Sequence, residues 1–462
     1  MSKTKHSMRA AAVAVAALLA AGAAQAQSAK NVIFFLGDGM GPTIITASRV
    51  HKGGEDSLLE FEKLARTARI KTFSNDAQTT DSAPSMAAYM TGVKMNNEVI
   101  SMTADTKAYD PNAKEYYTGG GDSTCPGTGN GSSVPTFLEI AKAAGKSVGA
   151  VSTTRITHAT PAVTYSHICN RNAENTIAEQ MVPSLPGYNT ALKGGVDVLL
   201  GGGRRHFYPK TTAGSKRSDA NDLIALMQTA GYSYVSKGSD LAKIDPAGTQ
   251  KLLGLFNDSD MNYDLDRTKN AIDEPSLADM TEKALRILKK NDKGFFLMVE
   301  GGRIDHALHG TNAKRAIQDT LAFDDAIARA LSLVDLKDTL VVVTADHDHV
   351  LTMNGYGKRG KENVLGLVKD IKTGRPALAA DGKPYTTLVF GNGPNRKETR
   401  DDLTAVDTTA DAYLQETGVR LSSETHGGGD VKLHAAGAGS ETFKGTMDNT
   451  KVFTLMKKAS GL

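Results

Sequence analysis

Acidic residues follow three apolar segments of this sequence, and histidines lie in neighbouring loops. The apolar segments are typical of buried strands in a parallel sheet. Several unpaired carboxylates gathered at one sheet edge would repel one another, and bound cations would remove that cost. Mixed histidine and aspartate ligands suit zinc, whereas oxygen ligands alone suit magnesium. The pattern therefore predicts a metal centre built from Asp38, Glu300, Asp346, His309, His347 and His426.

A serine stands at the expected start of a helix in the segment 78–94. We expect the helix to begin close to Ser82, because Pro84 suits a first helical turn, and to end near Gly92. Free backbone N–H groups and the positive end of the helix dipole would then face a phosphate bound at the serine. The alternative is that Asp81 or Ser82 only caps the helix.

Two further groups of polar residues stand out. Asp305 and His309 are four residues apart, which places both on one face of a helical turn. An acidic cluster is typical of a solvated surface, and calcium binding there is an open alternative although the spacing matches no recognised calcium loop. This cluster consists of Asp258, Asp260, Asp264 and Asp266.

Strands that alternate with helical segments must position these groups. We expect strands at 31–37, 147–152, 195–203, 294–300 and 339–344, and one more that runs towards Thr72. The alternation predicts an α/β fold with a doubly wound, mostly parallel central sheet flanked by helices. Ligands of such sheets bind at the carboxyl ends of the strands. A loop-rich segment at 103–135 and a small inserted subdomain near 355–420 complete the expected organisation.

Length and charge narrow the possible functions. The 462 residues, 40% hydrophobic and 23% charged, can bury one large core or two smaller ones. Residues 1–26 carry three basic residues, a short apolar run and an Ala24-Gln25-Ala26 pattern, which predicts a signal peptide cleaved after Ala26. The rest of the chain has 51 basic and 51 acidic residues, so it offers no basic footprint for nucleic acid. We expect a periplasmic or secreted protein with no membrane span, in which 27–462 form the functional domain.

The chain has two cysteines, Cys125 and Cys169. In an oxidising compartment, an isolated pair favours a disulfide over a metal site. Neither cysteine has the close spacing of a thiolate zinc site.

Seven motifs, in order along the chain, resemble those of the alkaline phosphatase family. They run from residue 31 to beyond residue 426 and so cover nearly the whole predicted mature chain. The resemblance implies the fold of that family and hydrolysis of phosphate monoesters. The motifs are Phe35-Leu-Gly-Asp38-Gly-Met40, Thr80-Asp81-Ser82-Ala83, His158-Ala-Thr160-Pro161, Asn170-Arg171-Asn172, Val299-Glu300-Gly-Gly-Arg-Ile-Asp305-His306-x-x-His309, Thr344-Ala-Asp346-His347 and Glu424-Thr-His426-Gly-Gly428.

The resemblance also implies a role for each matching residue. Ser82 corresponds to the nucleophile that becomes phosphoserine, and Arg171 to the arginine that binds phosphate. The implied cofactors are two Zn²⁺ ions, which would activate the serine and steady the attacking and leaving oxygens, and one Mg²⁺ ion. The implied ligands are Asp305, His309 and His426 for the first zinc, Asp38, Ser82, Asp346 and His347 for the second, and Asp38, Thr160 and Glu300 for magnesium.

Some positions depart from part of the family. His158 and His306 stand where other members have aspartate and lysine. We expect His158 to approach the magnesium site indirectly, so that Zn²⁺ or Co²⁺ could compete there, and His306 to contact phosphate through water, with Asp81 also beside the substrate. Four histidines match no ligand position and are assigned to packing or to the surface: His167, His206, His349 and His434.

The resemblance further implies a homodimer, although the N-terminal arm that embraces the partner in well-known dimeric members is absent from the predicted mature chain. The leading hypothesis is an exported, metal-dependent phosphomonoesterase. A phosphodiesterase or sulfatase of the same superfamily is the alternative, but these typically use threonine or a modified residue in place of Ser82. A non-catalytic phosphate-binding or zinc-storage protein would bind metal without turnover.

Overall fold

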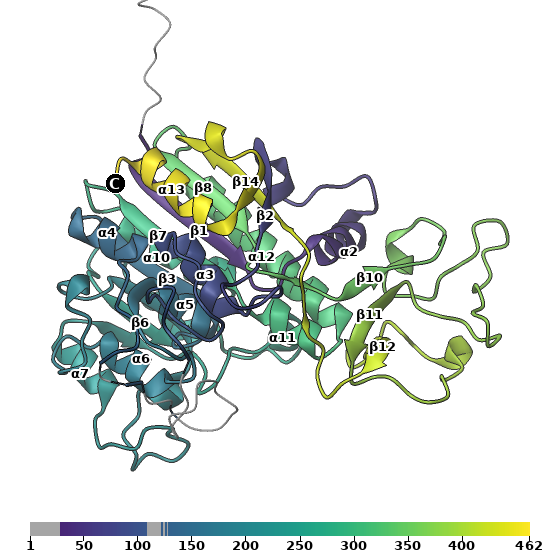
Figure 1. Ribbon diagram of the computed structural model, residues 1–462, viewed down its shortest axis with the longest axis horizontal. Coiled ribbons are helices and arrows are strands. Elements are labelled where there is room, and N and C mark those ends of the chain that lie inside the picture. Colours follow the sequence, from purple (N-terminus) through teal and green to yellow (C-terminus); the bar gives the residue numbers. More distant parts are fainter. Residues whose placement is uncertain (1–27, 109–121, 123–124, 127) are drawn as a thin grey trace, which may run out of the picture.

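The computed structural model describes residues 28–108, 122, 125–126 and 128–462. The predicted signal peptide therefore lies outside the described residues. A ten-stranded sheet runs through the centre of the described chain (Figure 1). The strand order is β15 (Gly445–Asp448), β2 (Arg66–Lys71), β14 (Val431–Gly437), β8 (Thr339–Thr344), β1 (Asn31–Gly37), β7 (Phe295–Gly301), β3 (Ser147–Arg155), β4 (Val198–Gly202), β6 (Leu252–Leu255) and β5 (Ser233–Val235).

The sheet is mostly parallel, as predicted. Within it, β14 runs antiparallel to its neighbours β8 and β2, and the other neighbouring pairs are parallel. Strands β8, β1 and β7 lie side by side and are buried along their whole length. Their continuous apolar sequences follow from this position, because helices cover both faces of the sheet. Leu36 of β1 pairs with Glu300 of β7 and with Thr344 of β8, so the three strands end at one edge.

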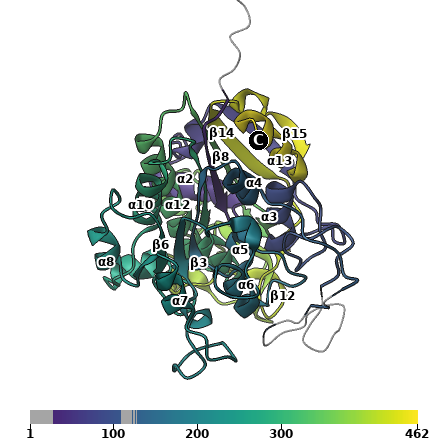
Figure 2. The ribbon, with the colours of Figure 1, turned by 90° about the vertical axis from the view of Figure 1, so that its left-hand side faces the viewer.

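Helices cover both faces of the sheet, which confirms the doubly wound arrangement. Figure 2 shows α2, α10 and α12 on one side and α3, α4, α5 and α13 on the other. The C-terminal helix α13 packs against α3, and Asn449 Nδ2 donates a hydrogen bond to Ser85 Oγ at 3.2 Å. The bounds are α2 (Pro42–Gly53), α3 (Ser82–Thr91), α4 (Phe137–Ala143), α5 (Ala159–Tyr165), α6 (Glu174–Gln180), α7 (Leu223–Thr229), α8 (Gly238–Lys243), α9 (Asp264–Lys269), α10 (Leu277–Leu288), α11 (Arg303–His309), α12 (Ala313–Leu333) and α13 (Asn449–Ser460).

A side lobe, residues 351–420, projects from the main sheet (Figure 1). It contains a three-stranded sheet of β10 (Leu351–Met353), β11 (Leu388–Gly393) and β12 (Thr417–Arg420). The chain leaves the main body after β9 (Asp348–His349) and returns at β13 (His426–Gly427), and these two short strands pair with each other. The lobe is therefore an insertion whose two ends meet, close to the position predicted for the subdomain.

The two cysteines form the expected bond. Cys125 and Cys169 are joined as a disulfide with a Cα–Cα distance of 5.8 Å. The described residues of the loop-rich segment 103–135 contain no helix or strand beyond an isolated bridge. In the part of the chain that the structure describes, no helix has both the length and the apolar character needed to cross a membrane.

Candidate metal and phosphate site

Three buried carboxylates meet at the shared end of the central strands. Asp38 follows β1, Glu300 belongs to β7, and Asp346 lies two residues beyond β8. All three side chains are inaccessible to solvent. Burial and repulsion from Asp346 raise the pKa of Asp38, and burial raises the pKa of Glu300 to about 7. Carboxylates in this arrangement resist ionisation unless a cation joins them.

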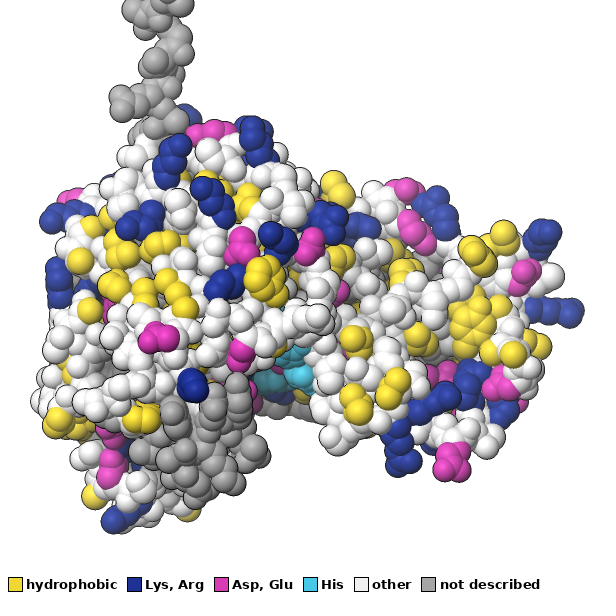
Figure 3. Space-filling model, in the orientation of Figure 1, with side chains coloured by type: hydrophobic (Ala, Val, Ile, Leu, Met, Phe, Trp, Pro, Cys, Tyr) yellow, Lys and Arg dark blue, Asp and Glu magenta, His cyan; other side chains and the backbone are white. Residues whose placement is uncertain are grey.

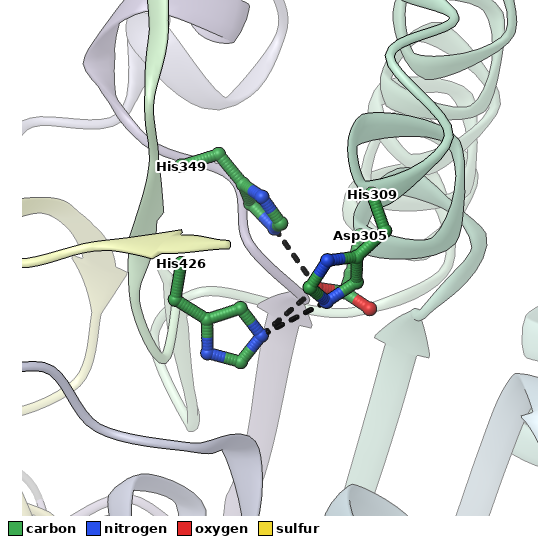
Figure 4. Close-up of side chains that lie close together, drawn as sticks. All are labelled: Asp305, His309, His349 and His426. Carbon is green, nitrogen blue, oxygen red and sulfur yellow. Dashed lines mark hydrogen bonds and ion pairs between the residues drawn. The ribbon is translucent and has the colours of Figure 1, made fainter. Parts of the chain in front are cut away.

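The first group of possible ligands surrounds the carboxylate of Asp305 (Figure 4). Asp305 in the first turn of α11 and His309 in its last turn lie four residues apart on one face, as the spacing predicted, and His309 Nε2 is 3.3 Å from Asp305 Oδ1. His426 of β13 brings its Nε2 to 3.1 Å from His309 Nε2. The side chains of Asp305, His309, His349 and His426 thus point toward one another from three separate elements.

Hydrogen bonds to the backbone orient two of these imidazoles. His309 Nδ1 lies 2.6 Å from the carbonyl oxygen of Glu424, and His426 Nδ1 lies 2.8 Å from that of Thr80. A carbonyl oxygen can only accept, so Nδ1 carries the proton in both rings. The lone pair then sits on Nε2, the atom that faces the centre of the group. This is the arrangement by which proteins prepare histidine for a metal ion.

His349, which the sequence analysis assigned to packing or the surface, belongs to this site. Its ring is 3% exposed and lies between two carboxylates, with Nε2 at 2.8 Å from Asp305 and Nδ1 at 2.6 Å from Glu424. Burial alone would lower the pKa of His349, but these two contacts raise it to about 10. His349 therefore acts as a charged donor that fixes Asp305. Its position two residues after His347, in a strand, is the signal that could have revealed it.

Ser82 lies at the second group, formed by Asp38, Asp346 and His347. Its Oγ is 3.3 Å from His347 Nε2 and 3.4 Å from Asp38 Oδ1. The serine is the first residue of α3, and Asp81 caps the helix by accepting a hydrogen bond from the backbone N–H of Ala83 at 2.8 Å. Asp81 therefore caps the helix, while the side chain of Ser82 faces Asp38 and His347.

The helix that carries Ser82 is fixed to the end of β8. Ser85 Oγ donates to the carbonyl of Asp346 at 2.7 Å, and Tyr89 Oη donates to the carbonyl of Ala345 at 2.8 Å. The helix ends at Gly92 in the left-handed conformation with φ 75°, as the sequence predicted. Two hydroxyl groups on the buried face of α3 thus hold the serine beside the carboxylates.

A third group joins Asp38 and Glu300 with His158. Glu300 Oε2 accepts hydrogen bonds from the hydroxyls of Ser152 and Thr154 of β3, the latter at 3.1 Å. Thr160, the remaining predicted magnesium ligand, is fully buried in α5.

Unpaired oxygens test whether metal ions fit these groups. Buried oxygens in proteins almost always have hydrogen-bond partners. Among the described residues, four predicted ligand atoms are buried without any: Asp38 Oδ2, Thr160 Oγ1, Glu300 Oε1 and Asp346 Oδ2. Three of them form the predicted magnesium set. The donors therefore fit cations at this edge of the sheet.

Arg171 pairs with Asp81, the residue before Ser82, and is held at both ends of its guanidinium. Nη1 forms a 2.6 Å ion pair with Asp81, and Nη2 donates to His158 Nε2 at 2.8 Å. Burial and the nearby Arg171 charge lower the pKa of His158 well below its usual value. His306 lies with its ring 5.6 Å from that of His158, accepts at Nδ1 from Arg303 at 2.6 Å, and has a pKa lowered to about 4 by burial. Both histidines are thus neutral.

Residues outside the site behave as ordinary structural groups. His167 contacts Glu139, His206 contacts Asn175, and His434 packs against Phe61, so these three histidines serve packing as predicted. The acidic cluster, for which calcium was an open alternative, forms four separate ion pairs. These are Asp258–Arg204, Asp260–Arg155, Asp264–Arg267 and Asp266–Arg315.

The site opens to solvent where the side lobe meets the main body. Figure 3 shows histidine side chains at the base of the indentation between the two. The side chains of His309 and His426 are 31% and 15% exposed, whereas Asp38 and His347 are fully buried. A small ligand could therefore reach the first group from solvent while the second group stays shielded.

Comparisons with known proteins agree with this geometry. The sequence profile of a family described as alkaline phosphatase matches residues 29–462. The tissue-nonspecific alkaline phosphatase of Rattus norvegicus is 37% identical over 470 residues, which cover 94% of this chain and 84% of that protein. The alkaline phosphatase of Gadus morhua is 37% identical over 447 residues, which cover 88% and 87%.

Solved structures of alkaline phosphatases also resemble this chain. The alkaline phosphatase of Thermus thermophilus superposes with a TM-score of 0.68 at 28% identity, covering 96% of this chain and 94% of that one. A variant of TAB5 alkaline phosphatase with Mg bound in its M3 site superposes with a TM-score of 0.66 at 25% identity, covering 95% and 99%. The profile match over nearly the whole chain, with relatives above 30% identity, shows that this chain belongs to the alkaline phosphatase family of phosphomonoester-hydrolysing enzymes.

Proposed function

We propose that this protein is an exported phosphomonoesterase that works through a phosphoserine at Ser82, with two Zn²⁺ ions and one Mg²⁺ ion. The observation that carries the proposal is the position of Ser82 Oγ, within 3.4 Å of Asp38 and His347 and at the start of α3. A capping serine needs neither contact. Buried ligand oxygens without partners surround it.

The three groups of side chains would hold the ions. The first zinc would be held by Asp305, His309 and His426. The second zinc would be held by Asp38, Asp346, His347 and Ser82, and the magnesium by Asp38, Thr160 and Glu300. When bound, the ions supply positive charge that favours the serine alkoxide and the leaving oxygen. His158 Nε2 accepts from Arg171, so in this arrangement its buried, unpartnered Nδ1 carries the ring proton. This supports an indirect role for His158 at the magnesium site, where Zn²⁺ or Co²⁺ would compete.

The side chains divide the remaining work. Ser82 Oγ attacks phosphorus, the alcohol leaves, and water then cleaves the phosphoserine to release inorganic phosphate and restore the serine. Arg171 donates one N–H of Nη1 to Asp81 and one N–H of Nη2 to His158. One N–H on each terminal nitrogen is left for two phosphate oxygens. This two-point contact favours the dianion of a monoester over a diester.

The test is hydrolysis of a chromogenic phosphate monoester by the purified mature protein, with and without chelator. Ser82→Ala should retain the bound metals, because the other ligands remain, and lose nearly all turnover. Ser332→Ala, an exposed serine at the end of α12, is the matched control. Chelator-insensitive turnover, or full activity of Ser82→Ala, would refute the mechanism. A diester and a sulfate ester assayed in parallel distinguish the alternative activities, and bound metal without turnover would favour the storage protein.

Export and assembly complete the proposal. The disulfide between Cys125 and Cys169 supports an oxidising compartment, and residues 1–26 would be the signal peptide that leaves 27–462 as the catalytic domain. Fractionation of cells, with the mass of the mature chain, tests cleavage after Ala26. The family supports a homodimer, which sedimentation of the purified protein tests.

A further inference from the structure

Glu98 has a backbone conformation that its residue type does not explain. It lies between α3 and α4 with φ 71°, in the left-handed region where glycine is the ordinary choice. Non-glycine residues held in this region cost free energy and cluster at functional sites. A glycine would provide the same turn with less strain, so the presence of glutamate at position 98 has to be explained by its side chain.

The backbone of Glu98 is tied directly to the phosphate-binding arginine. The loop that contains it pairs with the loop of Arg171 through reciprocal hydrogen bonds between Ile100 and Ile168, at 2.9 and 3.0 Å. In this register, the Arg171 N–H donates to the carbonyl of Glu98 at 2.7 Å. The N–H of Glu98 donates in turn to Asp81, the carboxylate that pairs with Arg171. The two loops therefore hold Glu98 at a fixed position beside the arginine.

The carboxylate of Glu98 stays close to this arginine rather than extending into solvent. Its Oε2 accepts a hydrogen bond from Asn172 Nδ2 at 3.0 Å, next to Arg171 in the chain. Burial and the charge of Asp81 raise the pKa of Glu98 to about 7, so the group is ionised at alkaline pH. Asp81 already balances the positive charge of Arg171 in a direct ion pair. Glu98 is thus a surplus negative charge at a site built for a dianion.

We propose that Glu98 determines how tightly the Arg171 site holds phosphate, by weakening its attraction for the monoester and for the inorganic phosphate product. The inference rests on the proposed function, in which Arg171 contacts the substrate. Glu98 acts through Arg171 and is a positioning and tuning residue, not a catalytic one. A nearby unit charge in a partly solvated site changes the affinity for a charged ligand by about three- to tenfold.

The experiment compares the metal-loaded wild type with Glu98→Gln, which keeps the shape and removes the charge, and Glu98→Gly, which also suits the left-handed backbone. Glu441→Gln is the matched control, because this exposed residue follows β14 at the opposite edge of the sheet. KM, kcat and the competitive inhibition constant of inorganic phosphate are measured at about pH 9, where Glu98 is ionised, in about 0.02 M and about 0.5 M salt.

Both Glu98 variants should lower KM and the inhibition constant together, by about three- to tenfold at low salt, and the difference should shrink at high salt. An inhibition constant equal to that of the wild type in Glu98→Gln would overturn the inference. So would a change confined to Glu98→Gly or unaffected by salt, because either would show a backbone role. Failure of the proposed function appears separately, as a wild type without monoester turnover. In that case, calorimetry with inorganic phosphate still compares the variants.

Discussion

Neutralising Glu300 should have opposite effects on the metal-free and the metal-loaded protein. In the metal-free fold, burial raises the pKa of this carboxyl from 4.5 to about 7. Because the folded-state pKa of Glu300 lies above its unfolded value, the contribution of this group to the free energy of unfolding is fully present below pH 4.5. That contribution is lost as the pH rises through about 7. Each tenfold change in proton affinity is worth about 1.4 kcal/mol, so the ionised group costs about 3 kcal/mol.

Glu300→Gln removes that cost while keeping the local hydrogen bonds. The amide oxygen can accept from Ser152 and Thr154 as the carboxylate does, and the NH₂ group takes the place of Oε1, which has no partner. An unpaired buried amide costs about 1 kcal/mol, which leaves a net gain of about 2 kcal/mol at alkaline pH and none at about pH 4.5. With metals bound, the variant lacks an anionic ligand and should be less stable than the wild type.

Urea unfolding followed by circular dichroism measures both effects, since the chain contains no tryptophan to report by fluorescence. Wild type, Glu300→Gln and the control Glu441→Gln are compared at about pH 5 and about pH 8.5, after chelation and after zinc and magnesium are restored. If metal-free Glu300→Gln were no more stable than the wild type at the higher pH, the idea that these carboxylates await a cation would be refuted.

Three other outcomes can be checked on the same preparation. Arg171→Lys should lower kcat/KM for a monoester by about a hundredfold, because lysine offers no fork for two oxygens, and a smaller loss would argue against two-point binding. The double variant Cys125→Ser, Cys169→Ser should lower the free energy of unfolding by up to about 4 kcal/mol, since the disulfide closes a loop with a sequence separation of 44. Equal unfolding midpoints of this variant and the wild type, in urea without reductant, would contradict this. Burial lowers the pKa of His434 from 6.5 to about 4, because the buried ring resists protonation. The contribution of the neutral ring to the free energy of unfolding is therefore fully present above pH 6.5 and is lost as the pH falls through about 4. His434→Phe should flatten that decline by about 3 kcal/mol, as acid unfolding midpoints would show.

The carboxylates at the strand ends were predictable from the sequence for a physical reason. A parallel strand covered on both faces must be apolar throughout, so the first charged residue after it marks the sheet edge. Asp38, Glu300 and Asp346 follow this rule, and the local helix around Ser82 follows from Pro84 and Gly92. The order β8–β1–β7, which makes these three carboxylates neighbours, depends on pairings between distant segments and does not appear in local patterns.

Residues defined by long-range contacts escaped prediction. His349 was assigned to packing or the surface because its contacts with Asp305 and Glu424 join segments that lie far apart in the chain, and its spacing from His347 alone does not show these partners. The hydroxyls of Ser152 and Thr154 point at Glu300 from a different strand, about 150 residues away in the chain. The disulfide was predicted correctly because a chain with only two cysteines leaves one pairing.

The packing of α13 on α3 has a consequence for how the protein is made. The ribosome produces α3, with Ser82, near the beginning of the chain, whereas Asn449 and the rest of α13 emerge last. His426 also comes late, after the side lobe. A growing polypeptide therefore carries the proposed nucleophile long before the support and the proposed ligand that complete the centre. On the proposed export route, the protein would stay inactive during translation and translocation, and cytoplasmic phosphate esters would be spared until the last residues have crossed the membrane.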